Sequence, residues 1–321
     1  MSVIAESPQT RRDARVRAVV PGHRGWRLPV LPLILAVVAL VGVAVLMYPQ
    51  IAGWFSQYAQ SRVIEEYSVG LSDDQVLADE IAAARAYNAG LVGGDAAVAA
   101  GERVVQSVSG AASDDDVYDS LLNADGHGVM ARIKIPSIGV DLPILHGTSD
   151  DVLEKAIGHL EGTALPVGGV DTHSVLTGHR GLASAELFTN LDKVAEGDTF
   201  TIEVFGEVLT YRVVRTLVVA PDETETLYPE RGRDLVTLVT CTPLGINSHR
   251  ILVTAERITP TPIEDVQAAG AVPDVPGFPW WALVLGGAVV VAGVYVWVSG
   301  RPGVVVAPTS ATAAGDQREA T

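Results

Sequence analysis

The sequence predicts a mainly β domain, a closed barrel of short strands with a few short helices, flanked by two apolar helices. Three observations support this prediction. Segments of alternating apolar and polar residues run from residue 129 to residue 258, separated by Gly, Pro and Asp turns, as in an antiparallel or mixed barrel. Two uncharged apolar runs enclose the polar part of the chain. Residues with helical spacing lie between the first run and the barrel.

The first apolar run, Leu28–Met47, has twenty residues without charge. As a helix it reaches about 30 Å, the thickness of a bilayer's hydrocarbon core, so we expect a transmembrane helix over 28–48. The arm before it, residues 1–27, holds six arginines against two acidic residues, and the positive-inside rule places this arm in the cytoplasm. A cleaved signal peptide is the alternative, although Met47-Tyr48-Pro49-Gln50 lacks a small-x-small cleavage site.

The second uncharged run, 275–300, predicts a transmembrane helix over 278–299. Aromatic residues stand near both of its ends, as in interfacial belts: Trp280, Trp281, Tyr295 and Trp297. Two spans leave the polar middle outside and return the tail, 300–321, to the cytoplasm. The expected location is therefore the cell membrane, with the lipid bilayer as one partner and both termini cytoplasmic.

A helical extension, residues 49–127, is expected before the barrel. Apolar residues recur at helical spacing from Trp54 to Asn88, and a break near Gly70 divides them into two helices. Gly90–Asp116, rich in Gly, Ala, Ser and Asp, is interpreted as a connection and a candidate lid. Asp114-Asp115-Asp116 starts a short helix over 117–122 rather than forming a calcium loop, because EF-hand spacing is missing.

The barrel, residues 128–259, is predicted from alternation and turn residues. Seven strands are expected: Val129–Ile135, Val140–Leu145, His173–Thr177, Thr199–Phe205, Val208–Val219, Leu235–Cys241 and Ile251–Ile258. Two helical pieces, Asp150–Ala156 and Ala183–Leu191, interrupt them, and Phe205-Gly206-Glu207 is a tight turn. A Pro-rich extended linker, 260–277, leads back to the membrane.

Charge and cysteine content limit the function. The net charge of −16 and the lack of a basic stripe in the polar middle exclude a nucleic-acid-binding surface. One cysteine, Cys241, cannot form an internal disulfide. An unpaired thiol on an exported domain is a liability unless the protein uses it, so we interpret Cys241 as reactive rather than as a buried apolar side chain.

Cys241 ends one predicted strand and Arg250 opens the next. If the two strands pair, both side chains reach one carbonyl group at the mouth of a hairpin. Thiolate attack would create an oxyanion, which a guanidinium stabilises in a dry cleft. Thr240 and Thr242 flank the nucleophile and are candidate substrate-binding residues, with an ordinary strand role as the alternative.

His179 is the candidate acid/base. A free thiol is mostly protonated at neutral pH and needs an imidazole to share its proton, and His179 follows a predicted strand at the start of a Gly-containing loop. The role of its neighbour Arg180 is left open between an effect on the pKa of His179 and the binding of carboxylates. His249, which adjoins Arg250, is a further substrate-binding candidate. No His-Glu-x-x-His pattern is present, so we expect no metal.

These residues form a pattern that resembles the sortase family. The first part of the pattern is Thr-Leu-Val-Thr-Cys-Thr-Pro at residues 237–243, followed by Arg250, and the second is Thr-Gly-His-Arg-Gly at residues 177–181. Three shorter pieces accompany them: Ile135-Pro136, Leu142-Pro143-Ile144 and His146-Gly147-Thr148. Three features resemble class C, the pilus-assembling sortases. They are the two spans, the helical extension and the stretch from Thr242-Pro243 to His249-Arg250. The family's Asp-Pro-aromatic lid anchor is matched only by Asp95, since Ala96 and Ala97 follow it.

The resemblance implies an eight-stranded closed barrel and a cysteine transpeptidase without a cofactor. Cys241 would cleave an LPxTG-like sorting signal at Thr-Gly through a thioester, and a pilin lysine amine would resolve the thioester. Two alternatives stay open. One is a sortase that anchors surface proteins to the amine of a peptidoglycan stem peptide; the other is a non-catalytic membrane scaffold that binds extracellular peptides.

Overall fold

The structure, a computed structural model, describes residues 25–70, 74–92, 116–123, 128–273 and 276–301. The chain divides into two compact units. One runs from Ala44 to Val284 and contains the barrel; the other consists of the two ends, Met1–Val43 and Leu285–Thr321.

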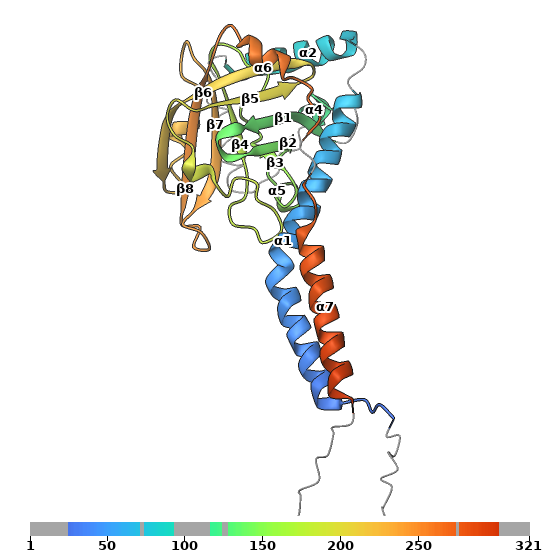
Figure 1. The fold of residues 1–321 in the computed structure, drawn as a ribbon. Helices are drawn as coiled ribbons and strands as arrows, with labels where there is room; N and C mark the ends of the chain where they lie inside the picture. The colour runs from blue at the N-terminus through green and yellow to red at the C-terminus, as the bar shows by residue number, and fades with distance from the viewer. Residues whose placement is uncertain (1–24, 71–73, 93–115, 124–127, 274–275, 302–321) are drawn as a thin grey trace, which may run out of the picture. The chain divides into compact units, whose positions relative to one another are not determined.

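Within the described residues, eight strands close into a barrel in the order β1-β2-β3-β4-β7-β8-β6-β5 (Figure 1). The strands are β1 (Val129–Ile135), β2 (Val140–His146), β3 (Ile157–His159), β4 (Thr172–Thr177), β5 (Thr199–Val204), β6 (Glu207–Val219), β7 (Asp234–Thr242) and β8 (His249–Arg257). The pairs β2–β3 and β4–β7 are parallel and the others antiparallel. The closed eight-stranded barrel expected from the sequence is confirmed.

The seven predicted strands are present, with ends that differ by up to two residues. The tight turn at Phe205-Gly206 is also present, and both residues have positive φ, the conformation of a type I′ hairpin turn. Strand β3 was not predicted. It has three residues, all buried, so it shows no alternation of apolar and polar side chains.

The short helices fit the prediction only in part. Helix α5 covers Asp150–Leu153, the first turn of the piece expected over 150–156. The helix expected over 183–191 is wrong: turns occupy this stretch and a 3₁₀ helix, η2 (Leu191–Lys193), follows them. Leu187 has a φ of +38°, which a helix does not accommodate. The other 3₁₀ helices are η1 (Pro136–Ile138) and η3 (Glu225–Leu227).

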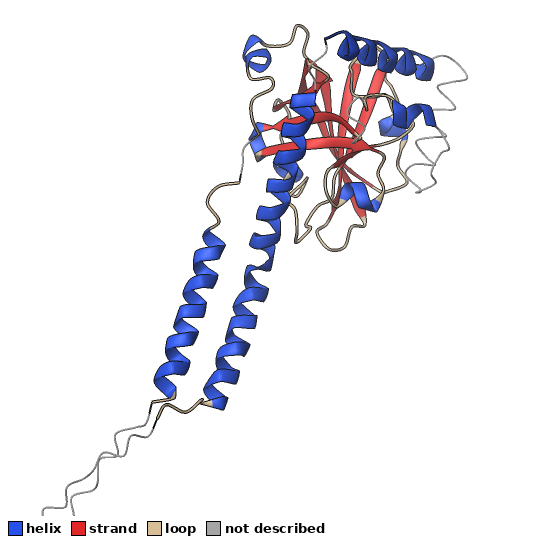
Figure 2. Cartoon of the chain, turned by 90° about the vertical axis from the view of Figure 1, so that its right-hand side faces the viewer, coloured by secondary structure: helices blue, strands red, loops and turns tan. Residues whose placement is uncertain are grey.

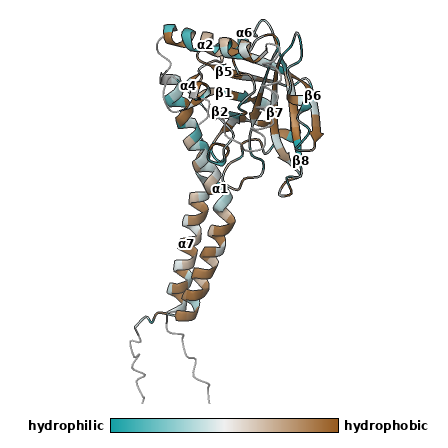
Figure 3. Ribbon diagram, turned by 180° about the vertical axis from the view of Figure 1, so that it is seen from behind, coloured by the Kyte–Doolittle hydropathy of each residue, from teal (hydrophilic) through white to brown (hydrophobic). Residues whose placement is uncertain are grey.

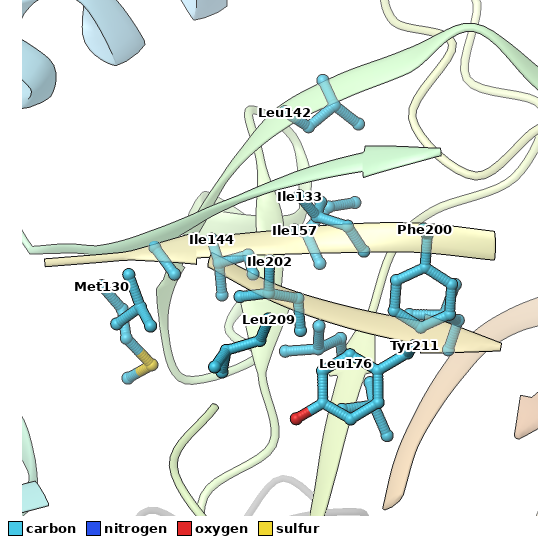
Figure 4. Close-up of a cluster of buried hydrophobic side chains, with 14 of the residues drawn as sticks. Met130, Ile133, Leu142, Ile144, Ile157, Leu176, Phe200, Ile202, Leu209 and Tyr211 are labelled. Atoms are coloured by element: carbon cyan, nitrogen blue, oxygen red, sulfur yellow. The ribbon is translucent and has the colours of Figure 1, made fainter. Parts of the chain in front are cut away.

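The barrel interior is filled by large apolar side chains from alternate strand positions (Figure 4). Phe200 and Tyr211 from the paired strands β5 and β6 stack with ring centroids 5.7 Å apart. Ile133, Ile144 and Ile157 are fully buried around them. Each such side chain contributes about 1.5–3 kcal/mol by leaving water, so this core fixes the strand register.

The N-terminal extension packs on the barrel (Figure 2). It contains the last part of α1 (Val30–Gly70), α2 (Asp74–Val92) and α4 (Asp116–Ser120). The Tyr67 hydroxyl accepts a 2.9 Å hydrogen bond from the Phe205 amide. The Asn88 side chain bonds both backbone groups of Leu165, at 2.8 and 2.9 Å. The two expected helices exist, but the first is continuous with the apolar run, in a single helix of 41 residues.

The segment after β8 is anchored to the barrel rather than extended throughout. It forms a short helix, α6 (Ile263–Gln267). The fully buried Arg132 pairs with Asp141 through two 2.6 Å contacts and donates to the Ala271 carbonyl at 2.8 Å. The Thr210 hydroxyl donates to Asp265 at 2.7 Å. The polar outer faces of β1 and β6 therefore hold this segment in place.

By length and composition, two helices among the described residues could cross a membrane: Val30–Ser68 and Trp280–Ser299, the latter being α7. The sequence of α7 contains no charged residue, and its ribbon is mostly in the hydrophobic colours (Figure 3). In the unit formed by the two chain ends, Trp26 Nε1 donates to the Trp297 carbonyl at 3.1 Å. The guanidinium of Arg301 lies 3.7 Å from the centre of the Trp297 ring.

Candidate active site

Cys241 and Arg250 face each other in the β7–β8 hairpin. They are direct partners in the antiparallel register, so their Cα atoms are about 4.5–5.5 Å apart. Both residues are partly exposed. The pairing inferred from the sequence is therefore present.

His179 is brought beside Cys241 by the parallel pair β4–β7. Residues 62 apart are partners along this pair, up to Thr177 and Val239. The Gly178 amide then donates to the Val239 carbonyl at 3.0 Å. Continuing the same offset places His179 opposite Cys241, on chains that are about 4.8 Å apart in a sheet.

All three side chains line one cavity of about 530 Å³. Its apolar wall is a cluster on the outer face of β4, β6, β7 and β8, with contributions from the residue that follows β3 and from the β6–β7 loop: Leu160, Val175, Val219, Leu227, Val239 and Leu252. Three carboxylates also line it, Asp150, Glu161 and Glu223. The cavity therefore combines a thiol, an imidazole and a guanidinium with an apolar wall.

The β7–β8 loop orients Arg250. The Pro243 carbonyl accepts hydrogen bonds from the amides of Ile246 and Asn247, at 3.1 and 2.9 Å, which closes a tight turn. Arg250 Nη1 donates to the carbonyls of Asn247, at 2.9 Å, and His249, at 3.1 Å. One nitrogen is thus held by the loop, and the guanidinium still lines the cavity.

The predicted substrate-binding residues lie around this cavity but are not among the described residues that line it. Thr240 is buried, and its hydroxyl donates to the Gly178 carbonyl at 2.7 Å. The Thr242 hydroxyl accepts from Arg180 Nη1 at 3.1 Å. His249 is exposed, with Nδ1 2.9 Å from the Ser248 hydroxyl. The lid candidate Asp95 lies outside the described residues.

A buried polar cluster behind one cavity wall was missed by the sequence reasoning. The Tyr118 hydroxyl accepts a 3.0 Å hydrogen bond from the amide of Gly147, which lines the cavity. The same hydroxyl lies 2.9 Å from His159 Nδ1, and His159 Nε2 lies 2.9 Å from the Ala164 carbonyl. These contacts match a neutral imidazole that donates from Nε2 and accepts at Nδ1.

Burial sets the protonation of this cluster. His159 is fully buried, and the loss of hydration lowers its pKa from 6.5 to about 4, against the opposing effect of the Ala164 carbonyl. Burial likewise raises the pKa of the Tyr118 hydroxyl. Both groups therefore stay neutral at physiological pH. No local pattern signals this cluster, because its members come from α4 and from the ends of β2 and β3.

Among the described residues, no group of three or more His, Cys, Asp and Glu side chains is arranged to hold a metal ion. His173, for example, bonds the Tyr228 carbonyl at 3.0 Å and the Thr237 hydroxyl at 2.7 Å. Its ring nitrogens are occupied by protein partners.

Comparison with known proteins decides the family. The sequence model of the sortase domain family matches residues 133–258. The present chain is 46% identical in sequence to sortase C-1 from Actinomyces oris, whose crystal structure is known. The match covers 57% of the present chain and 98% of the A. oris chain, with a TM-score of 0.51. The chain belongs to the sortase family.

Two further sortases show how far the similarity extends. Streptococcus pneumoniae sortase C, whose structure was described for its catalysis and pilin substrate specificity, is 37% identical. That match covers 61% of the present chain and 96% of the S. pneumoniae chain, with a TM-score of 0.50. Sortase D of Bacillus subtilis is 29% identical over 130 residues, 40% of the present sortase and 63% of the B. subtilis protein.

Proposed function

We propose that this sortase is a membrane-anchored cysteine transpeptidase in which Cys241 is the nucleophile, His179 the acid/base and Arg250 the oxyanion stabiliser. The observation that carries the proposal is that these three residues line one cavity: Cys241 and Arg250 are partners in β7 and β8, and His179 follows the end of β4, which pairs with β7. Acyl transfer requires a nucleophile, a proton carrier and a positive group close to one carbonyl carbon.

The proposed reaction has two halves. His179 takes the proton of the Cys241 thiol as the sulfur attacks the scissile carbonyl, and Arg250 faces the oxygen that gains negative charge. His179 then gives a proton to the leaving amine, and a thioester forms. An incoming amine attacks the thioester and loses a proton to His179; the C–S bond then breaks, and His179 returns the proton to the Cys241 sulfur. A guanidinium held by loop carbonyls reorients little during these steps, which makes its stabilisation of the oxyanion effective.

For the substrate we propose an LPxTG-like sorting signal, cleaved at the Thr-Gly bond, on a pilin subunit. The apolar wall of the cavity suits the Leu and Pro side chains of such a signal. The similarity to S. pneumoniae sortase C, described for pilin substrate specificity, supports a pilin over other surface proteins.

For the acceptor we propose a lysine amine of the next pilin subunit. A net charge of −16 attracts a cationic acceptor, and three carboxylates line the cavity itself. We place the barrel outside the cell, with α1 and α7 as membrane spans and both termini in the cytoplasm. The two helices of spanning length support this topology, as does the arginine-rich arm.

The test is mass spectrometry of the full chain in detergent with an LPxTG-type peptide and two acceptors, a lysine-containing pilin peptide and a stem-peptide amine. The expected products are a thioester on Cys241 and a ligated lysine peptide, both absent from Cys241→Ala. Arg250→Ala should lower kcat by about 10²–10³-fold, and the exposed Arg212→Lys should not change it.

Each other outcome has a defined meaning. Ligation to the stem-peptide amine alone would favour anchoring to peptidoglycan over pilus assembly. Full activity of Cys241→Ala would refute the proposed nucleophile. Absence of thioester and ligated product in the wild type would refute transpeptidation of this sorting signal.

A further inference from the structure

Arg180 follows His179 directly, yet it is not among the described residues that line the catalytic cavity. Its side chain is nearly buried, 9% exposed, and every nitrogen of its guanidinium has a partner. Nε donates to the Thr189 carbonyl at 3.1 Å, Nη1 to the Thr242 hydroxyl at 3.1 Å, and Nη2 pairs with Asp192 at 2.8 Å. A side chain with this many fixed partners is suited to hold other groups in place.

The bond from Arg180 to Thr242 continues the β4–β7 register beyond the backbone ladder. Arg180 and Thr242 are 62 residues apart, as are Gly178 and Thr240, which are joined by the Thr240 hydroxyl. The ladder itself keeps the same offset. The two side-chain bonds therefore lie on either side of the one remaining pair with this offset, His179 and Cys241.

The partners of Arg180 belong to different elements. Asp192 lies in η2, Thr189 in the loop before it, and Thr242 at the end of β7, next to the thiol. The loop that starts at His179 returns to it, since the Phe188 amide donates to the His179 carbonyl at 3.1 Å. Gly181 touches the β7–β8 loop: a Cβ there would lie 2.4 Å from Leu244 Cδ2.

We infer that Arg180 is a positioning residue that sets the separation of His179 and Cys241 by clamping the loop after β4 to Thr242. The inference rests on the proposed function for its consequence in catalysis. Asp192 neutralises the charge of Arg180, so the effect is geometric rather than electrostatic. A displacement of about 1 Å in such a pair lowers a rate by up to about 10²-fold.

The first test is kinetic and uses matched variants of the full chain. Thr242→Val removes the acceptor hydroxyl, and Arg180→Lys keeps the charge but lacks the planar guanidinium whose three separate nitrogens each reach a different partner. Both should lower kcat by about 10–100-fold with KM within about twofold of wild type, because neither residue lines the cavity. Thr242→Ser, which keeps the hydroxyl, should regain most of the loss. Thr216→Val and Arg212→Lys, at exposed positions of β6, are the matched controls.

The second test does not depend on activity. Cys241 is the only cysteine of the chain, so His179→Cys creates a single pair of thiols. A disulfide between them requires Cα atoms about 4.4–6.8 Å apart. We expect a disulfide in this variant under mild oxidation, formed at least about tenfold more slowly when Thr242→Val or Arg180→Lys is added, and at the original rate with Thr242→Ser or Thr216→Val.

The outcomes separate this inference from the proposed function. A disulfide rate that does not respond to Thr242→Val or Arg180→Lys would overturn the clamp, and so would failure of the His179→Cys parent to form the bond. An inactive wild type whose disulfide rate nevertheless follows the predicted order would refute transpeptidation and leave the clamp standing. Circular dichroism of each variant establishes that a slow rate belongs to a folded barrel.

Discussion

The buried imidazole of His159 makes the stability of the barrel depend on pH. In the folded protein the pKa of His159 is lowered to about 4, chiefly by burial, from the 6.5 of an exposed imidazole. Between these values the unfolded chain binds a proton that the folded chain does not bind. The free energy of unfolding must therefore fall as the pH falls from about 7 towards 4.

The size of this effect follows from the difference in pKa. A shift from 6.5 to about 4, at about 1.4 kcal/mol per unit, amounts to about 3 kcal/mol. Such a loss is a large fraction of the 5–15 kcal/mol that is typical of a folded protein. Tyr118, Thr163 and His146 surround the ring in the folded state, and none of them is an acid that would retain a charged imidazole.

The assay compares urea unfolding of the wild type and His159→Gln at pH 7.5 and pH 4, followed by far-ultraviolet circular dichroism. Glutamine can donate to the Ala164 carbonyl but does not titrate, so its stability should fall about 3 kcal/mol less than that of the wild type over this range. The exposed His249→Gln serves as the control and should follow the wild type. A difference below about 1 kcal/mol between the wild type and His159→Gln would refute the reasoning.

Three further predictions concern contacts that shape the site or support the barrel. Tyr118→Phe removes the acceptor of the Gly147 amide and should lower the free energy of unfolding by about 1–3 kcal/mol in urea titrations; an unchanged midpoint would contradict this. Arg132→Met leaves Asp141 without its buried partner and should cost about 3–5 kcal/mol, measured in the same way, whereas a loss below about 1 kcal/mol would show that the pair is dispensable. Gly178→Ala places a Cβ 2.7 Å from a ring carbon of the core and should lower both stability, by about 1–3 kcal/mol, and kcat; normal turnover would show that the chain before the imidazole can shift freely.

The sequence was sufficient for the elements whose pattern is local. Alternation located seven of the strands, and a cysteine at the end of one strand with an arginine at the start of the next implied the Cys241–Arg250 pair, because a hairpin pairs neighbouring segments. Strand β3 escaped because its three residues are all buried. The false helix over 183–191 has apolar residues at helical spacing, but the barrel draws Phe188 into its core and leaves Leu187 with positive φ.

The position of His179 was the part of the site that local patterns could not give. It depends on β4 pairing with β7, a parallel contact between segments 62 residues apart. Parallel neighbours require a crossover, and here β5 and β6 lie within it. The Tyr118–His159 cluster escaped for the same reason, since burial and tertiary contact rather than spacing produce it.

The strand order also sets when the chain becomes chemically competent. The β7–β8 hairpin comes last among the strands in the sequence but lies between β4 and β6 in the barrel. When the strands emerge in the order of the sequence, β4 and β6 therefore have no strand between them until the hairpin has also emerged. Such long-range pairing is intrinsically slow, because the entropy of closing the intervening loop is lost before the contacts form. Because the hairpin carries the thiol and the guanidinium while β4 leads to the imidazole, the insertion that closes the barrel also assembles the three groups. A partly made barrel contains the imidazole without its partners.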